Sequence, residues 1–292
     1  MTLSVASARA AEQRSNPLLV FLKRDVALAT FLGLFAALVF ALAIGPWLWP
    51  LHPDAIDLSN SLQGPSAAHP MGTDDTGRDM LARFLSGGRT SVFAGLLIAV
   101  IGAVVGCVLA LLAGSMRGWL DTVLTWLTNS ILCFPAILLA MAIAMAIGPG
   151  VTAVVIGLSI HSFPWYMRTL RSEVMRLYGQ DFIRSTDAIG AHPARILFRH
   201  VFPHLVPTII LQMAAVFGAS ILSLAALGFL GLGAQPPTAE WGALITEGQQ
   251  FFLTGQWWIA GFPGMGLLIA VTLTTLIADR AREVLDPRSD AV

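Results

Sequence analysis

Side chains that could do chemistry gather in two polar stretches of an otherwise apolar chain. One reads MGTDDTGRDMLARFLSGGRTS over 71–91, and the other reads DAIGAHPARILFRHVFP over 187–203. The charged groups of the first are close enough in sequence to pair with one another. This favours a structural role, such as a cap on the helix that follows, over a substrate site. The arginines and histidines of the second could contact a partner protein or lipid headgroups.

The apolar segments around these stretches predict a membrane protein. Of the 292 residues, 56% are hydrophobic and 12% are charged, whereas soluble domains are usually about 25% charged. Six segments without Asp, Glu, Lys or Arg come near or above the roughly 20 residues that cross a bilayer. They cover 26–49, 91–114, 123–147, 151–167, 205–231 and 257–278. The predicted fold class is an all-α integral membrane protein with six transmembrane helices, because open sheet edges stay unsatisfied in lipid.

The basic residues predict which way these helices point. With a cytoplasmic N-terminus, four segments share one side: the tail over 1–25, the loops over 115–122 and 168–204, and the tail over 281–292. Of the 17 Lys and Arg residues, 14 lie in these segments or, as Arg280, directly before the C-terminal one, and the exceptions are Arg78, Arg83 and Arg89. The positive-inside rule therefore places both termini in the cytoplasm, together with the stretch over 187–203. The polar leader over 1–25 also argues against a cleaved signal peptide.

The predicted spans contain no group that would drive transport or catalysis. A charged residue inside a membrane helix usually marks an ion or proton path, and His161 is the single titratable exception of this kind. No Ser/His, Asp/Asp or His-rich cluster occurs at catalytic spacing. This argues against an ion-coupled transporter and against an intramembrane enzyme, so the energy for any transport should come from elsewhere. His161, Cys107 and Cys133 are interpreted as packing residues.

Small residues, a proline and several tryptophans predict details of the helix bundle. Gly102 and Gly106 have GxxxG-like spacing, which lets helices approach closely either within the chain or against a second subunit. Pro135 lies inside the third span and should kink it. Four tryptophans fit an interfacial aromatic belt: Trp47, Trp49, Trp257 and Trp258.

The loop over 168–204 shows helical periodicity on both sides of a glycine. Four residues after the glycine fall on one stripe of an amphipathic helix: Ala194, Leu197, Phe198 and Val201. Pro193 suits the first position of that helix. The apolar residues of 182–189 predict a second short helix, which Gly190 would stop. Periodicity leaves two readings open: a helix pair resting on lipid headgroups, or a docking element with apolar side chains flanked by arginines.

The same loop resembles the EAA loop in permease subunits of bacterial ATP-binding-cassette importers. That pattern runs Glu-Ala-Ala, three residues, Gly, nine residues, then Ile-x-Leu-Pro. Gly190 and Pro203 occupy its Gly and Pro positions at that spacing, with Phe202 in the Leu position. Besides Phe202, the chain departs from the pattern at four residues: Arg184, Ser185 and Thr186 replace Glu-Ala-Ala, and His200 replaces Ile.

Two further segments are similar to the dipeptide, oligopeptide and nickel subfamily of these permeases. The stretch over 71–91 resembles a subfamily signature at six residues: Gly72, Thr73, Asp74, Gly77, Arg78 and Asp79. The segments EWGALITEGQQ and FPGMGLLIAVTLTTLIADRAREVLDPR resemble the last third of the subfamily. The resemblance is to the C-type member of a two-permease pair.

This resemblance implies a type I importer permease fold. The implied parts are a cytoplasmic tail over 1–25, a first helix over 26–49, an extracytoplasmic loop over 50–90, a five-helix core over 91–280 and a cytoplasmic tail over 281–292. Within the core, the loop over 168–204 would dock on an ATPase. The implied docking residues are Arg184, Ser185, Thr186, Asp187, Gly190, Ala191, Ala194, Leu197, Phe198 and Pro203.

The resemblance also implies partners in the bacterial inner membrane. They are a homologous second permease, two cytoplasmic ATPase subunits, an extracytoplasmic solute-binding protein and membrane lipid, without nucleic acid. ATP and Mg²⁺ would bind to the ATPases, because this chain has no GxxxxGK[ST] motif for binding phosphate. The chain itself is expected to have no enzyme activity and to bind no metal or cofactor. The loop over 232–256, with Pro236, Pro237, Trp241 and Gly242, is the expected contact for the binding protein.

The expected function is a permease subunit for ATP-driven import of short peptides. A nickel or metal-chelate importer of the same architecture is the alternative, because the binding protein rather than the permease would select the solute. A stand-alone channel or secondary transporter is the distant alternative.

Overall fold

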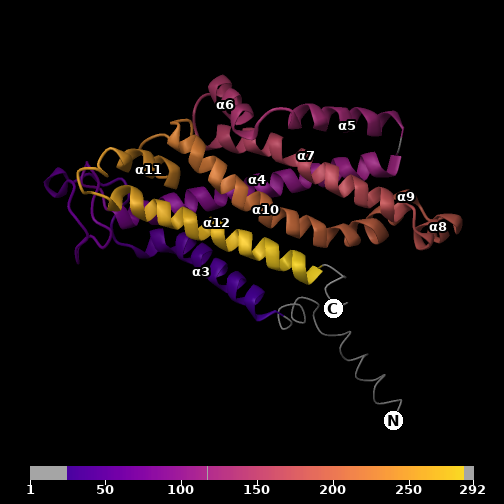
Figure 1. Cartoon of the computed structure of the whole chain (residues 1–292), viewed down its shortest axis with the longest axis horizontal. Coiled ribbons are helices and arrows are strands. Elements are labelled where there is room, and N and C mark those ends of the chain that lie inside the picture. The colour runs from indigo at the N-terminus through magenta and orange to yellow at the C-terminus, as the bar shows by residue number, and fades with distance from the viewer. Residues whose placement is uncertain (1–24, 117, 286–292) are drawn as a thin grey trace, which may run out of the picture.

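The computed structural model describes residues 25–116 and 118–285, apart from the side chains of Asp187 and Leu285. Five long helices run side by side along the molecule (Figure 1). They are α3 (Val26–Leu48), α4 (Met80–Met116), α7 (Val151–Tyr178), α10 (Phe202–Phe229) and α12 (Trp258–Leu285). The shorter helices are α5 (Trp119–Leu132), α6 (Ala136–Ile147), α8 (Asp181–Ala188), α9 (Pro193–Ile196) and α11 (Trp241–Gln249), with a 3₁₀ turn at Leu58–Asn60 and a π turn at Leu197–Val201. Within the described residues, β pairing is limited to one bridge between Thr73 and Asp79. The predicted all-helical class is therefore confirmed.

Helix α4 forms the centre of the bundle and contacts α3, α5, α7, α10, α11 and α12. Its small residues allow α7 to pack closely along it. A methyl group at Gly102 would collide with the Ser162 hydroxyl, and one at Gly106 would lie 2.5 Å from Tyr166 Cβ. The GxxxG-like spacing thus serves packing within the chain, where a close helix approach maximises van der Waals contact.

The loops alternate between the two ends of the bundle. The segment over 49–79, the α6–α7 turn and α11 lie at one end, and the start of α3, the α4–α5 turn, α8 and α9 lie at the other (Figure 1). Helix α12 also ends on the side of the molecule that faces α8 and α9, although it stops short of them. The described parts of the basic segments that the sequence groups together therefore lie toward the same side of the bundle. The predicted tail over 1–25 lies outside them but for Asp25.

By length and composition, four of the described helices could each cross a membrane, and α5 with α6 could form a fifth, bent span. Helix α7 contains the predicted fourth span, 151–167, and is long enough to cross. Its sequence is less apolar, however, because His161, Ser162 and Pro164 interrupt it. Among the described residues, helix length and apolarity thus establish four spans, or five with the bent pair, and not the six that were predicted.

The kink expected at Pro135 is a complete break. Helices α5 and α6 meet at 89°, and Pro135 is the N-cap of α6 with ψ 135°. Proline has no N–H to bond into a preceding turn, and it pushes the residue before it out of helical geometry. The third predicted span, 123–147, is therefore two helices.

Two helices extend beyond their predicted spans. Helix α4 begins at Met80 rather than near 91, because the Asp79 carboxylate accepts from the Ala82 N–H at 2.8 Å and caps its first turn. Helix α7 continues to Tyr178, and in this part Arg171 bonds to Asp121 of α5, Nη2 to Oδ2 at 2.6 Å. The non-helical part of the predicted 168–204 loop is correspondingly short.

Candidate functional site at the α8–α9 segment

Helices α8 and α9 meet at a glycine whose backbone has a left-handed conformation. Gly190 has φ +79°, and the Ala191 N–H donates to the Thr186 carbonyl at 3.3 Å, which closes α8 in a Schellman-type turn. Pro193 then begins α9, and the His192 ring accepts from the Ala194 N–H at 3.3 Å. These contacts agree with the predicted pair of short helices joined at Gly190.

Apolar side chains on the inner side fix this segment to the bundle. Ile183 of α8 and Ile196 of α9 are buried, and both pack in one core cluster with Leu177 of α7 and Leu111 of α4. Phe182 lies beside the ring of His204, with 5.7 Å between the ring centroids. The two short helices are therefore packed in a fixed position against the ends of the long helices.

The outer side of the same segment presents large apolar groups to solvent. Ile189 is 84% exposed and Phe198 is 65% exposed. Three arginines of the segment are exposed as well: Arg184, Arg195 and Arg199, of which Arg184 also lines a pocket with Ser115 and Met116 of α4. We call these five residues the α8–α9 outer surface. Exposed apolar side chains flanked by cations are typical of a protein-contact surface.

The predicted stripe over 194–201 does not lie on one face, which corrects the interpretation of its periodicity. Val201 is buried and Leu197 is half-buried, whereas Ala194 and Phe198 face outward. The cause is the π turn at Leu197–Val201, because hydrogen bonding from i to i+5 adds a residue to the turn and rotates the side chains that follow. Ile196, off the predicted stripe, supplies the buried contact instead.

The other predicted docking residues are brought together on the segment without forming a closed site. Ser185 is exposed, and the half-buried Thr186 donates its hydroxyl proton to the Phe182 carbonyl at 2.7 Å. Ala191 is half-buried, and Pro203 is exposed in the first turn of α10. The side chain of Asp187 lies outside the described residues.

The signature residues over 72–79 form a buried polar cluster at the opposite end of the molecule. Asp74 accepts from Arg78 Nε at 2.6 Å, and Arg83 Nη2 donates to Glu247 of α11 at 2.7 Å. Asp79 accepts from the Trp49 indole at 2.9 Å and also bonds to His69 at 2.8 Å. The predicted pairing of these groups with one another is therefore observed.

Backbone geometry accounts for the remaining signature residues. Gly72 and Gly77 have φ +77° and +76°, and a Cβ at Gly77 would collide with the Asp57 carbonyl. Thr73 is fully buried, and its carbonyl accepts from the Trp258 indole at 3.1 Å. Trp258 is thus a core residue of this loop and not a member of an aromatic belt.

Helix α11 contributes residues whose partners the sequence does not indicate. Glu240 caps α11 through the Gly242 and Ala243 N–H groups, both at 3.0 Å, and accepts from the Ser91 hydroxyl at 2.8 Å. Trp241 is fully buried, and its indole donates to the Phe84 carbonyl at 3.0 Å. Trp241 and Gly242 therefore cannot be the expected binding-protein contact, and the exposed residues Pro236, Pro237, Phe252 and Leu253 are the accessible part of this loop.

Burial sets the electrostatics of both glutamates of α11. Burial raises the pKa of Glu240, and the three hydrogen bonds that it accepts oppose the rise. Burial also raises the pKa of Glu247, against the opposing charges of Arg83 and Arg78. These carboxylates and their partners link α11 to α4 and to the loop before it, which is a structural arrangement.

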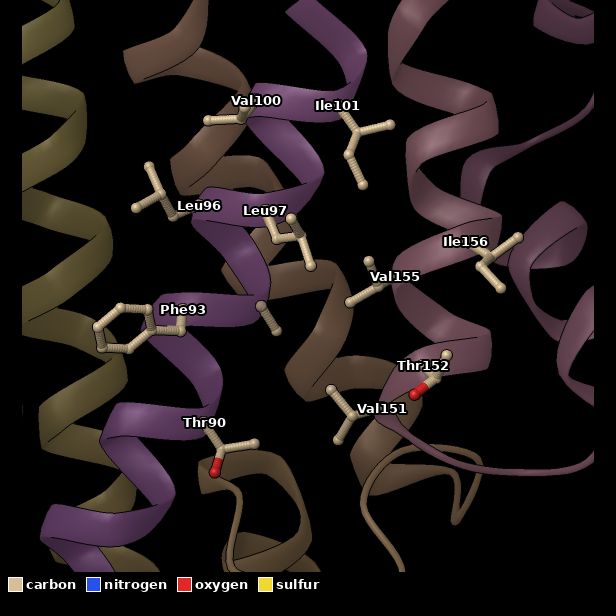
Figure 2. A pocket seen from close by; sticks show the side chains of 11 residues that line it. Thr90, Phe93, Leu96, Leu97, Val100, Ile101, Val151, Thr152, Val155 and Ile156 are labelled. Atoms are coloured by element: carbon tan, nitrogen blue, oxygen red, sulfur yellow. The ribbon is translucent and has the colours of Figure 1, made fainter.

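An apolar groove of about 700 Å³ lies along α4 and α7 (Figure 2). Thr90 and Thr152 are its only polar lining residues. The remainder are Phe93, Ala94, Leu96, Leu97, Val100, Ile101, Val151, Val155 and Ile156. Such a surface fits acyl chains or an apolar helix and offers little to a polar solute.

Comparison with known proteins supplies the context for this geometry. A family model described as binding-protein-dependent transport system inner membrane component matches residues 102–290. The probable D,D-dipeptide transport system permease protein DdpC of Escherichia coli K12 is 34% identical over 86% of this chain and 84% of its own length. The dipeptide transport system permease protein DppC of Alkalihalophilus pseudofirmus is 41% identical over 79% and 75%. The glutathione transport system permease protein GsiD of Pectobacterium atrosepticum is 38% identical over 92% and 89%.

A solved structure shares the arrangement of the helices. An inward-facing form of the MetNI methionine ABC transporter superposes with a TM-score of 0.57, over 71% of this chain and 98% of the matched chain. The sequence identity is 19%, so this likeness concerns the fold.

Proposed function

Because the chain belongs to the family of binding-protein-dependent transport system inner membrane components, we propose that it couples ATP hydrolysis on partner subunits to import of short peptides. As a member of this family it is a multi-pass inner membrane protein and an ABC importer permease. The proposal concerns the coupling of the chain to ATPase subunits, its orientation in the membrane and the solute that it transports.

The α8–α9 outer surface is the observation that carries the coupling proposal. Its exposed apolar residues and arginines lie at one end of the bundle, while Ile183 and Ile196 anchor the same segment to α4 and α7. A rigid segment whose outer side binds an ATPase can transmit the movement of that ATPase to the long helices. The Gly190 turn sets the angle between its two halves.

The proposed topology has six membrane crossings: α3, α4, the α5–α6 pair, α7, α10 and α12. Both termini and the α8–α9 segment would then face the cytoplasm, and the buried cluster around Asp74 would face outward. The gathering of basic residues toward the α8–α9 end supports this orientation.

The proposed assembly contains this chain, a second permease, two ATPase subunits that bind ATP and Mg²⁺, and an extracytoplasmic solute-binding protein. The permeases would form the translocation path together. The described residues contain no group of three or more His, Cys, Asp or Glu that could hold a metal ion, so a metal would have to be carried as a chelate. The relatives compared above are named for a dipeptide, a D,D-dipeptide and glutathione, which supports peptides as cargo.

Purification of the whole assembly tests this proposal. We expect the chain to copurify with two ATPase subunits, and ATP hydrolysis to rise when the solute-binding protein carrying Ala-Ala is added. If the binding protein stimulated ATP hydrolysis only when it carried a nickel chelate, the proposed cargo would be a metal chelate instead of a peptide. A stable chain that transports solute without ATPase subunits would contradict the importer function altogether.

A further inference from the structure

A cavity between α7 and α10 differs in character from the apolar groove along α4 and α7. Its volume is about 330 Å³, enough to admit a short stretch of peptide backbone. It is lined by His161 and Trp165 of α7, by Ser220 and Ser223 of α10, and by Ala136 at the start of α6. Segments far apart in sequence thus bring polar groups to one place.

The depth of this cavity corresponds to the middle of a bilayer. His161 lies ten residues into α7, about 15 Å along the helix from its outer end. Ser220 lies nine residues before the end of α10, about 13 Å from the same side of the molecule. The hydrocarbon core is roughly 30 Å thick, so both groups are near its midplane.

The lining offers neutral hydrogen-bonding groups. The imidazole of His161 lines the cavity and has no hydrogen-bond partner among the described residues; its Nδ1 is inaccessible, so the other ring nitrogen is the one that a ligand could meet. The Ser220 hydroxyl donates to the Val216 carbonyl at 2.7 Å, which leaves its oxygen free to accept. No Asp, Glu, Lys or Arg lines the cavity. Such groups suit an uncharged polar ligand that both donates and accepts.

The break at Pro135 adds backbone donors at the same place. Helix α6 begins at Ala136 beside the cavity, and no side chain caps its first turn. The first N–H groups of a helix lack acceptors within the helix. Broken helices that end at a midplane cavity form solute sites in many transporters.

Simple packing does not account for these residues. The imidazole of His161 gains no hydrogen bond from the side chains packed around it, and apolar side chains would fill the space without burying a polar group. A lipid acyl chain cannot hydrogen-bond to the accessible part of the imidazole. The amide of a peptide supplies both a donor and an acceptor, and it is present in every peptide whatever the side chains.

We propose that this cavity is a midmembrane subsite where His161, Ser220 and Ser223 hydrogen-bond to the backbone of a peptide in transit. The inference rests on the proposed function, because it assigns contacts within the path that function requires. Contact with the backbone alone would let peptides of different sequence use one path.

The test uses the full assembly in proteoliposomes, with its solute-binding protein and radiolabelled Ala-Ala as the probe. The measured quantity is the number of dipeptides imported per ATP hydrolysed. We expect His161→Leu and Ser223→Ala to lower this ratio about five- to tenfold, the effect of losing one hydrogen bond, and His161→Gln to restore most of it. Ser172→Ala is the control, because this serine of α7 donates to the Thr169 carbonyl at 2.7 Å and lies outside the cavity.

A second measurement does not depend on changing the histidine. In a Cys133→Ser background, Ser223→Cys should lose uptake in proportion to its labelling by a small methanethiosulfonate, whereas Thr152→Cys in the apolar groove should keep it. A wild-type ratio in His161→Leu, or equal loss in His161→Leu and His161→Gln, would overturn the subsite. Absence of ATP-driven uptake in the unmodified assembly would overturn the proposed function itself, and the subsite with it.

Discussion

At the scale of single residues, the chain separates structural charges from exposed ones. Arg83 is nearly inaccessible and pairs with two carboxylates, that of the buried Asp74 at 3.6 Å and that of Glu247 of α11 at 2.7 Å. Arg184, Arg195 and Arg199 are exposed at the other end. Charges of the first kind hold an element in place, because a buried ion cannot be left without its partner. Charges of the second kind remain free to meet a partner protein.

Gly190 is the residue whose backbone matters most to the proposed coupling. Valine at φ +79° is strained by about 1–2 kcal/mol, which would reduce the population of the docking conformation about tenfold. We expect Gly190→Val to lower peptide uptake while ATP hydrolysis continues, measured side by side in proteoliposomes. Gly264→Val is the control, since its Cβ would also meet open space but its backbone is helical. Equal uptake in both variants would contradict the role of the turn.

The carboxylate of Glu247 should stabilise the outer end of the bundle. Removing one partner of a buried pair costs roughly 3–5 kcal/mol, and because Glu247 is 30% exposed we expect about 2 kcal/mol for Glu247→Gln. The apparent Tm in detergent should then fall by about 4–8 °C. Asp75→Asn serves as the control, because its carboxylate is 43% exposed and 4.0 Å from Arg78, and its Tm should hardly change. A similar Tm loss in both variants would count against the cluster.

Glu240 should make the stability of the protein depend on pH. Burial raises its pKa in the folded chain above the ordinary value of a glutamate, so the folded chain keeps this proton to higher pH than the unfolded chain does. The stability that follows is present near pH 4.5 and is lost as pH rises through the folded pKa. The Tm difference between wild type and Glu240→Gln should therefore move in favour of glutamine as the pH rises from 4.5 to 8. A constant difference for Glu240→Gln would contradict the raised pKa.

At the scale of elements, sequence pattern predicted the helices better than their contacts. Apolar length located α3, α10 and α12, and Gly190 with Pro193 located the joint between α8 and α9, because turn chemistry is local. The π turn at Leu197–Val201 could not be predicted, since the i, i+3, i+4 spacing assumes a regular helix. The pairing of Arg83 with Glu247 was equally hidden, because the two residues are 164 positions apart and meet only in the folded bundle.

The α8–α9 segment should bind the ATPases through its exposed apolar residues. Fully burying such a side chain contributes about 1.5–3 kcal/mol, so the double variant Ile189→Ser with Phe198→Ser should weaken docking by more than about tenfold. The measurement is the amount of ATPase that copurifies with the tagged permease. Phe252→Ser with Leu253→Ser is the control, with comparable exposure at the opposite end. Loss of ATPase in the control but not in the α8–α9 variant would reverse the proposed orientation.

At the scale of the whole molecule, the two ends of the bundle have different chemistry. One end holds a rigid, internally paired cluster around Asp74 and α11, and the other presents the α8–α9 outer surface. Between them lie the predicted spans, which contain no Asp, Glu, Lys or Arg. This arrangement agrees with the proposed coupling, in which ATP hydrolysis on partner subunits acts on the bundle through the α8–α9 segment.

Uptake of radiolabelled Ala-Ala into proteoliposomes tests this coupling most directly. The vesicles contain the full assembly, with the solute-binding protein on the outer side and ATP supplied only on the side of the α8–α9 segment. We predict uptake that requires ATP, persists when ionophores collapse proton and sodium gradients, and disappears in the Ile189→Ser, Phe198→Ser variant. Uptake without ATP, or uptake that follows an ion gradient, would contradict the account.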